Sequence, residues 1–153
     1  MQIGGDTEAE RRPNEVTYYA SNPAEPYGMK VSRMDSHGGW IATPIDLTRI
    51  LVRVDKFPTK PDILQANSLN IMTTASSVDA GYAKGWSVNN AGNYWHNGSL
   101  PGTLAIMVRT QSGFCWAAMV NTRENQDFYA ADLDKLMWDL VNSVSKWPDY
   151  DLF

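Results

Sequence analysis

Dense apolar runs separated by polar turns in the second half of the chain predict a β-sheet. The runs cover Tyr94–Gly98, Thr103–Arg109 and Phe114–Asn121, and the turn Gln111–Gly113 joins the last two into a hairpin. Both hairpin strands are apolar on both faces, which is typical of strands covered on both sides. One further strand is predicted at Tyr82–Val88. The second half should therefore form an antiparallel sheet of about four strands.

Helical periodicity flanks this predicted sheet on both sides. Thr43-Pro44 is a helix start signal, with a capping threonine and a proline at the first helical position. The apolar residues of this helix are Ile45, Leu47, Ile50, Leu51 and Val54. A second helix is predicted from near Pro61-Asp62 to the polar cluster Thr73–Ser77, and a third from near Asp127 to Trp147-Pro148. The apolar stripe of the third is Leu133, Leu136, Met137, Leu140, Val141 and Val144.

These elements define the expected architecture. Residues 1–15 are polar and glycine-containing and are predicted to be a flexible lead-in, followed by a short β-type run at Val16–Tyr19. Residues 16–153 are expected to form a single α+β domain. In that domain two helices precede the antiparallel sheet, and one C-terminal helix packs on it.

Composition narrows the choice of partners. The chain has 153 residues, a net charge of −4 and no basic cluster, which argues against nucleic acid and against an anionic membrane surface. No apolar run is long enough for a membrane span. Residues 1–10 lack the apolar core of a signal peptide, so the chain is expected to be cytoplasmic if Met1 is the natural start. The single Cys115 excludes an internal disulfide.

Metal and cofactor chemistry find little support in the sequence. There are only two histidines, His37 and His96, and no histidine pair with metal-ligand spacing. No glycine-rich phosphate loop is present either. We therefore expect neither a metal site nor a cofactor.

Six short motifs, each weak alone, follow one another in an informative order. They are Glu15–Tyr19, Gly38–Leu47, Ile71–Thr74, Tyr82-x-x-Gly85-Trp86, His96-x-Gly98-Ser99-x-x-Gly102 and Asn121-Thr122-Arg123. Their order resembles that in the β-lactamase-like serine hydrolases, and is most similar to the branch of class C β-lactamases, D-alanyl-D-alanine carboxypeptidases and esterases. The resemblance implies the C-terminal portion of a β-lactamase-like fold. It also leaves localisation open, because this family is often periplasmic or secreted.

The resemblance also implies roles for particular residues. In this superfamily a serine of Ser-x-x-Lys attacks an acyl carbonyl, the lysine and a tyrosine of Tyr-x-Asn move protons, and a third motif lines the opposite wall. His96 stands at the position of the third motif's Lys or His. Gly98 would permit close approach of a substrate, and the backbone N–H of Ser99 would be one oxyanion-hole donor. From the residues alone, His96 could equally be a hydrogen-bonded strand residue.

A wider set of residues is expected to contact a ligand in such a cleft. Large aromatic side chains line binding surfaces, although they also fill cores, and both interpretations remain open. The expected ligand-binding residues are Tyr82, Trp86, Trp95, His96, Asn97, Ser99, Asn121 and Arg123.

The other two catalytic motifs are not found in the required order. Ser143-Val144-Ser145-Lys146 satisfies Ser-x-x-Lys, but at the end of a predicted helix instead of its start. No Tyr-x-Asn is present, and Ser68-Leu69-Asn70 and Ser87-Val88-Asn89 follow Glu15–Tyr19, whereas the second motif should precede it. We therefore expect a chain that starts after its family's nucleophile and is inactive alone, which leaves its status as an enzyme uncertain.

Without the preceding strands of that fold, the outer edge of Phe114–Asn121 should be exposed and apolar. Such edges recruit partners. The expected partner is a second copy, giving a homodimer, and the alternatives are a separate N-terminal fragment or residues 1–20 folding back. The alternative to the incomplete hydrolase is thus a non-catalytic ligand-binding or protein-interaction module.

Overall fold

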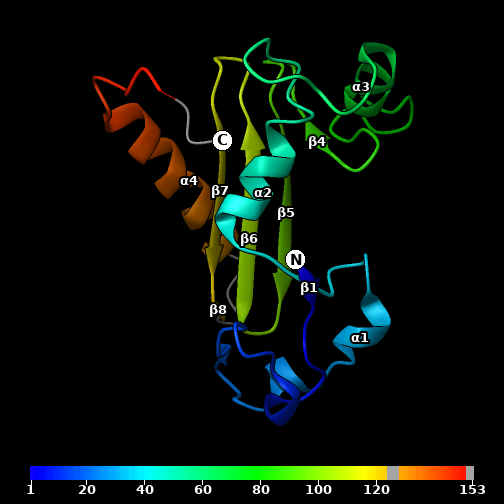
Figure 1. Ribbon diagram of the computed structural model, residues 1–153, viewed down its shortest axis with the longest axis vertical. Coiled ribbons are helices and arrows are strands. Elements are labelled where there is room, and N and C mark those ends of the chain that lie inside the picture. The colour runs from blue at the N-terminus through cyan, green and yellow to red at the C-terminus, as the bar shows by residue number, and fades with distance from the viewer. Residues whose placement is uncertain (124–127, 151–153) are drawn as a thin grey trace.

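The computed structural model describes residues 1–123 and 128–150, and its centre is a four-stranded antiparallel sheet (Figure 1). The strands lie in the order β4 (Ser87–Val88), β5 (Tyr94–Leu100), β6 (Thr103–Arg109) and β7 (Cys115–Val120). Each is paired with its neighbour in sequence, so the sheet is a simple meander. This confirms the predicted antiparallel sheet and the positions of its three long strands.

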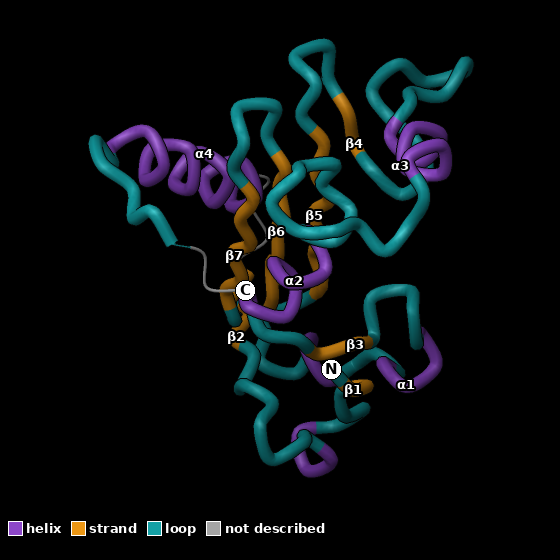
Figure 2. The backbone as a smooth tube through the Cα atoms, turned by 45° about the horizontal axis from the view of Figure 1, so that its top comes forward, coloured by secondary structure: helices purple, strands orange, loops and turns teal. Residues whose placement is uncertain are grey.

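Two helices cover opposite faces of the sheet. Helix α2 (Pro44–Leu51) crosses one face, while α4 (Phe128–Ser143) lies on the other, beside β7 in Figures 1 and 2. Because side chains alternate along a strand, neighbouring residues of β6 contribute to different cores. Met107 packs with the α2 side, and Val108 packs with the α4 side.

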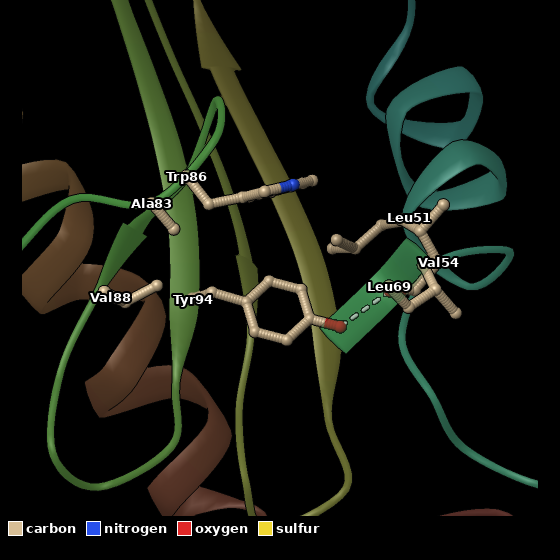
Figure 3. Close-up of a cluster of buried hydrophobic side chains, with 7 residues drawn as sticks. All are labelled: Leu51, Val54, Leu69, Ala83, Trp86, Val88 and Tyr94. Atoms are coloured by element: carbon tan, nitrogen blue, oxygen red, sulfur yellow. Dashed lines mark hydrogen bonds between the residues drawn. The ribbon is translucent and has the colours of Figure 1, made fainter. Parts of the chain in front are cut away.

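The core on the α2 side centres on Tyr94 (Figure 3). Its hydroxyl donates a 2.7 Å hydrogen bond to the carbonyl of Val54, just after α2, and its ring meets that of Trp86 edge-on. Burial raises the pKa of Tyr94, so the hydroxyl remains a donor. The whole buried set is Leu51, Val54, Leu69, Ala83, Trp86, Val88 and Tyr94.

The core on the α4 side is built around Trp116. Its ring meets that of Trp138 at a right angle, with centroids 4.9 Å apart. Ile106 and Val108 of β6 complete the buried centre, and the partly buried side chains packed on it are Trp95, Phe114, Ala118, Leu133, Met137, Trp138 and Val141. Of the apolar stripe predicted for the third helix, Leu133, Met137 and Val141 therefore pack on the sheet, whereas Leu136, Leu140 and Val144 are exposed.

The start of α2 matches its prediction. Thr43 accepts a hydrogen bond from the Asp46 N–H and Asp46 accepts one from the Thr43 N–H, which together form a capping box with Pro44 at the first helical position. The helix ends at Leu51, before the last residue of the predicted apolar set.

The N-terminal residues lie beyond one end of the sheet (Figure 1). The predicted lead-in contains β1 (Gln2–Ile3), which pairs antiparallel with β3 (Trp40–Ile41), and a 3-10 turn at Glu8–Glu10. β2 (Tyr19–Ala20) pairs parallel with β8 (Thr122–Arg123). A second 3-10 turn (Glu25–Tyr27) and α1 (Val31–Met34) complete this region.

Gly102, in the turn between β5 and β6, lies against this N-terminal region. It has φ +76°, and a Cβ there would lie 2.8 Å from the Cβ of Tyr18. Glycine is therefore required at this position for both its backbone conformation and its space.

Four element predictions are wrong in detail. The third helix ends at Ser143, before the predicted Trp147-Pro148, and the run Val16–Tyr19 is a strand only from Tyr19 onward. α3 begins at Ala66 and runs to Thr73, so the residues from Pro61 to Gln65 are irregular, and Ile63 is exposed. The predicted strand Tyr82–Val88 is interrupted at Gly85, which has φ +80°, and only Ser87–Val88 is paired as a strand. The predicted helix start at Asp127 lies outside the described residues. Within the described part, no helix is long and apolar enough to cross a membrane.

Candidate active-site wall along strand β5

The second half of β5 has an open edge. β4 pairs with β5 only at Tyr94 and Trp95, so the strand is paired with β6 alone from His96 to Leu100. The Asn89 N–H donates to the Asn93 carbonyl in the turn between β4 and β5. Because hydrogen-bonded and non-hydrogen-bonded pairs alternate along an antiparallel ladder, the N–H and C=O of Trp95 point toward β4.

The same alternation determines where the backbone of Ser99 points. Every second residue directs its N–H and C=O to the same side of a strand, so those of Asn97 and Ser99 face the open edge. Those of His96 and Gly98 face β6. Among the described residues, the Ser99 N–H has no hydrogen-bond partner. It is therefore free to donate to a ligand oxygen at this edge.

His96 lies exposed on the α2 face of the same strand. Its Nε2 is 3.2 Å from the Tyr82 hydroxyl, and the two rings meet edge-on with centroids 6.3 Å apart. Tyr82 reaches this position from the turn before β4. The structure thus brings together two of the predicted ligand-binding residues, which are 14 positions apart in sequence.

Gly98 leaves space beside these groups. A Cβ at this position would meet no heavy atom within 4 Å, apart from chain neighbours. The chain itself therefore does not require glycine here, and the open surface beside the strand is accessible to a ligand.

The remaining predicted ligand-binding residues are dispersed. Trp86 is only 6% exposed and belongs to the α2-side core. Trp95 is half-buried against the α4-side core. Asn121 donates through Nδ2 to the Thr17 carbonyl, and Arg123 belongs to β8. Val120 pairs with Leu104, which pairs with Ser99, so both residues lie at the Ser99 end of the sheet but two strands away from β5. Aromatic content alone did not separate core residues from surface residues.

Neither candidate nucleophile is paired with a base. The side chains of Ser99 and His96 are three positions apart on β5 and so point to opposite faces. Ser143 is the last residue of α4, and its hydroxyl donates to the Leu140 carbonyl. Among the described residues there is no cluster of three or more side chains suited to a metal ion.

Comparison with known proteins gives the family. The family model for Beta-lactamase matches residues 3–137. That match covers most of the chain, and the chain therefore belongs to the Beta-lactamase family, whose members share a serine-hydrolase-like fold. No curated protein matches the chain, and no solved structure matches it.

Proposed function

We propose that this chain supplies the third-motif wall of a serine-hydrolase acyl-transfer site and catalyses no turnover alone. The observation that carries the proposal is the open β5 edge, where the Ser99 N–H is unpartnered beside His96 and Gly98. A preorganised N–H at such an edge stabilises the oxyanion that develops as an acyl carbonyl is attacked. The substrates of such a site are amides or esters.

The absence of turnover is testable with a chromogenic β-lactam and a short-chain aryl ester. We expect rates equal to buffer alone, because no serine hydroxyl in the described residues is paired with a lysine or histidine base. A fluorophosphonate probe should likewise leave the protein unlabelled. Turnover that persists in both Ser99→Ala and Ser143→Ala would reveal a different nucleophile and defeat this part of the proposal.

The wall itself can be tested by titrating the protein with an arylboronic acid or a hydrolysed β-lactam while recording amide NMR spectra. The Ser99 amide should shift more than the Gly98 amide, which faces β6. Gly98→Val should remain folded, because its new side chain meets only open space, and it should block the shift. Asn97→Val, on the opposite face of the same edge, is the control and should retain it.

A second candidate function, an interaction module that pairs with its own copy, has separate support. β7 is paired only with β6 in the described part of the chain, and its residues Cys115–Val120 include no charge, proline or glycine. Beside it, α4 and the residues after it carry exposed apolar side chains, namely Leu136, Leu140, Val144 and Trp147. Two-fold pairing of β7 with β7 would join two sheets and bring these side chains together. A monomeric mass in solution would count against it.

A further inference from the structure

A polar hollow lies at the hairpin end of the sheet, away from the open edge of β5. Its volume is about 160 Å³, and its polar lining includes Lys56, Thr73, Asn89, Asn93, Arg109 and Gln111. The lining contains two cations and no carboxylate. None of its residues belongs to the wall formed by His96, Gly98 and Ser99.

Arg109 is the fixed charge of this hollow. Its side chain is 5% exposed, and the guanidinium lies 4.2 Å from the ring centroid of Phe57 and 5.1 Å from that of Tyr94. Nε donates to the Asp55 carbonyl and Nη1 to the Gly92 carbonyl. In the described chain, no carboxylate forms an ion pair with Arg109. A buried cation held only by neutral oxygens leaves a positive field at the hollow.

Lys56 adds a second positive charge beside it. Its φ of +62° is unusual for a residue with a side chain, and the conformation is held by the Asp62 carboxylate, which accepts the Lys56 N–H. The ammonium donates to the Thr73 hydroxyl at 2.8 Å. Burial, and then the nearby Arg109, lower the pKa of Lys56. The backbone conformation of Lys56 thus directs its ammonium toward the Arg109 guanidinium, which is also positively charged.

The three amide side chains of the hollow have used their acceptors and kept their donors. Asn89 Oδ1 accepts from the backbone N–H groups of Ala91 and Asn93. Asn93 Oδ1 accepts from the Gln111 N–H, and Gln111 Oε1 accepts from Arg109. These bonds fix the orientation of all three amides. Among the described residues, none of the three NH₂ groups donates to a protein acceptor.

We propose that this hollow binds a small oxyanion, such as a phosphate or carboxylate group. Such a ligand offers only acceptors, and the unused groups around the hollow are donors and positive charges. The nearest acids do not occupy it: the Asp62 carboxylate accepts the Lys56 N–H, and that of Asp55 accepts the Phe57 N–H. The site is independent of the hydrolase wall and stands even if that proposal fails.

The test is a titration of the full chain with inorganic phosphate and, separately, acetate, monitored by calorimetry and by the side-chain NH₂ signals of Asn89, Asn93 and Gln111. We expect saturable binding, with all three signals shifting together. Tighter binding of phosphate would identify a phosphate-type ligand, and tighter binding of acetate a carboxylate. Either result supports an oxyanion site, whereas no saturable shift with either anion overturns it.

Two variants localise the binding. Lys56→Gln removes one cation, and Asn93→Asp keeps the acceptor for the Gln111 N–H while replacing a donor by a negative charge. Each should weaken binding by about tenfold or more, since hydrogen bonds to charged groups have that strength. Lys84→Gln makes the same charge change as Lys56→Gln at an exposed position outside the hollow and should bind as the original protein does. Equal weakening in Lys84→Gln would refute the site, and unchanged amide spectra elsewhere confirm that the variants fold.

Discussion

At the scale of single residues, Asp55 shows how burial controls a charge. It is 4% exposed, its carboxylate accepts the Phe57 N–H at 2.8 Å, and the Cys115 thiol lies 3.6 Å away. Burial raises the pKa of Asp55 above its ordinary value, more than these hydrogen bonds lower it. The charged form is therefore a cost to the folded protein.

This cost predicts a pH dependence with a definite sign. A carboxyl with a raised folded-state pKa keeps its proton longer in the folded chain, so its contribution to stability falls as pH rises through that raised pKa. Asp55→Asn removes the titration but keeps an acceptor for the Phe57 N–H. We expect the variant to gain stability relative to the original protein between acidic and neutral pH, as measured by urea unfolding at several pH values.

Asp46 provides a control with the opposite sign. Its hydrogen bonds from the Thr43 backbone and side chain hold its pKa below the ordinary value. The contribution of Asp46 to the stability of the fold is therefore present above its unfolded-state pKa. It is lost as the pH falls through its lowered folded-state pKa. Asp46→Asn should lose stability at neutral pH, and the difference should shrink in acid. A loss in Asp55→Asn as large as that in Asp46→Asn would contradict the argument from burial.

Residue-scale reasoning from sequence recovered only part of the candidate site. The pairing of Tyr82 with His96 and the open backbone at Ser99 fit the predicted wall. Trp86 does not, because a buried tryptophan and a ligand-binding one look alike in a sequence. The hollow at Lys56 and Arg109 gave no sequence signal, because only the folded chain brings its lining together from four separate segments.

At the scale of the elements, α2 depends on its capping box. The helix has only 8 residues and covers the sheet through Leu51, so its first turn is a large part of it. Thr43→Ala removes the acceptor for the Asp46 N–H and should cost about 1 kcal/mol of unfolding free energy, measured by urea denaturation.

Thr48→Ala is the matched control for this cap. The Thr48 hydroxyl only donates back to the Pro44 carbonyl within the helix, and alanine has the higher helix propensity. Its effect should lie within about 0.5 kcal/mol of zero. If Thr48→Ala costs as much as Thr43→Ala, the cap is not what holds this helix.

Elements with long periodic patterns were predictable, and short ones were not. The three long strands and the start of α2 follow from apolar runs and a cap signal that depend on neighbouring residues alone. β1, β2, β3 and β8 have 2 residues each, and they form only because chain segments distant in sequence meet. Pro61-Asp62 suits a turn as well as a helix start, which explains the late start of α3 at Ala66.

At the scale of the whole molecule, the two outer edges of the sheet have different properties. The open part of β5, His96–Leu100, is largely polar and exposed, as suits a ligand-binding wall. β7 is apolar, and α4, which lies beside it in Figure 1, carries the exposed apolar side chains Leu136 and Leu140. A dimer formed through β7 would leave the β5 edge accessible, so the two proposed functions are compatible in one molecule.

The pairing of β7 identifies the substitution that tests this dimer. The hairpin bond between Thr110 and Phe114 sets the alternation, so Trp116, Ala118 and Val120 bond to β6, whereas the backbone of Ala117 faces outward. Ala117→Pro removes an outward N–H and keeps the β6 ladder. It should shift the mass in solution from dimer to monomer, by light scattering, while the fold is retained.

Ala118→Pro is the control for Ala117→Pro. It introduces proline at the next position of β7, where the N–H bonds to β6, so it should destabilise the fold itself.

The double variant Leu136→Lys, Leu140→Lys tests the helical part of the interface. It too should give monomers, because it introduces charges into an apolar contact. Asn142→Lys adds a charge elsewhere on α4 as the control. A dimer that survives both Ala117→Pro and the paired lysines does not use this surface, and the exposed β7 edge would then need another partner.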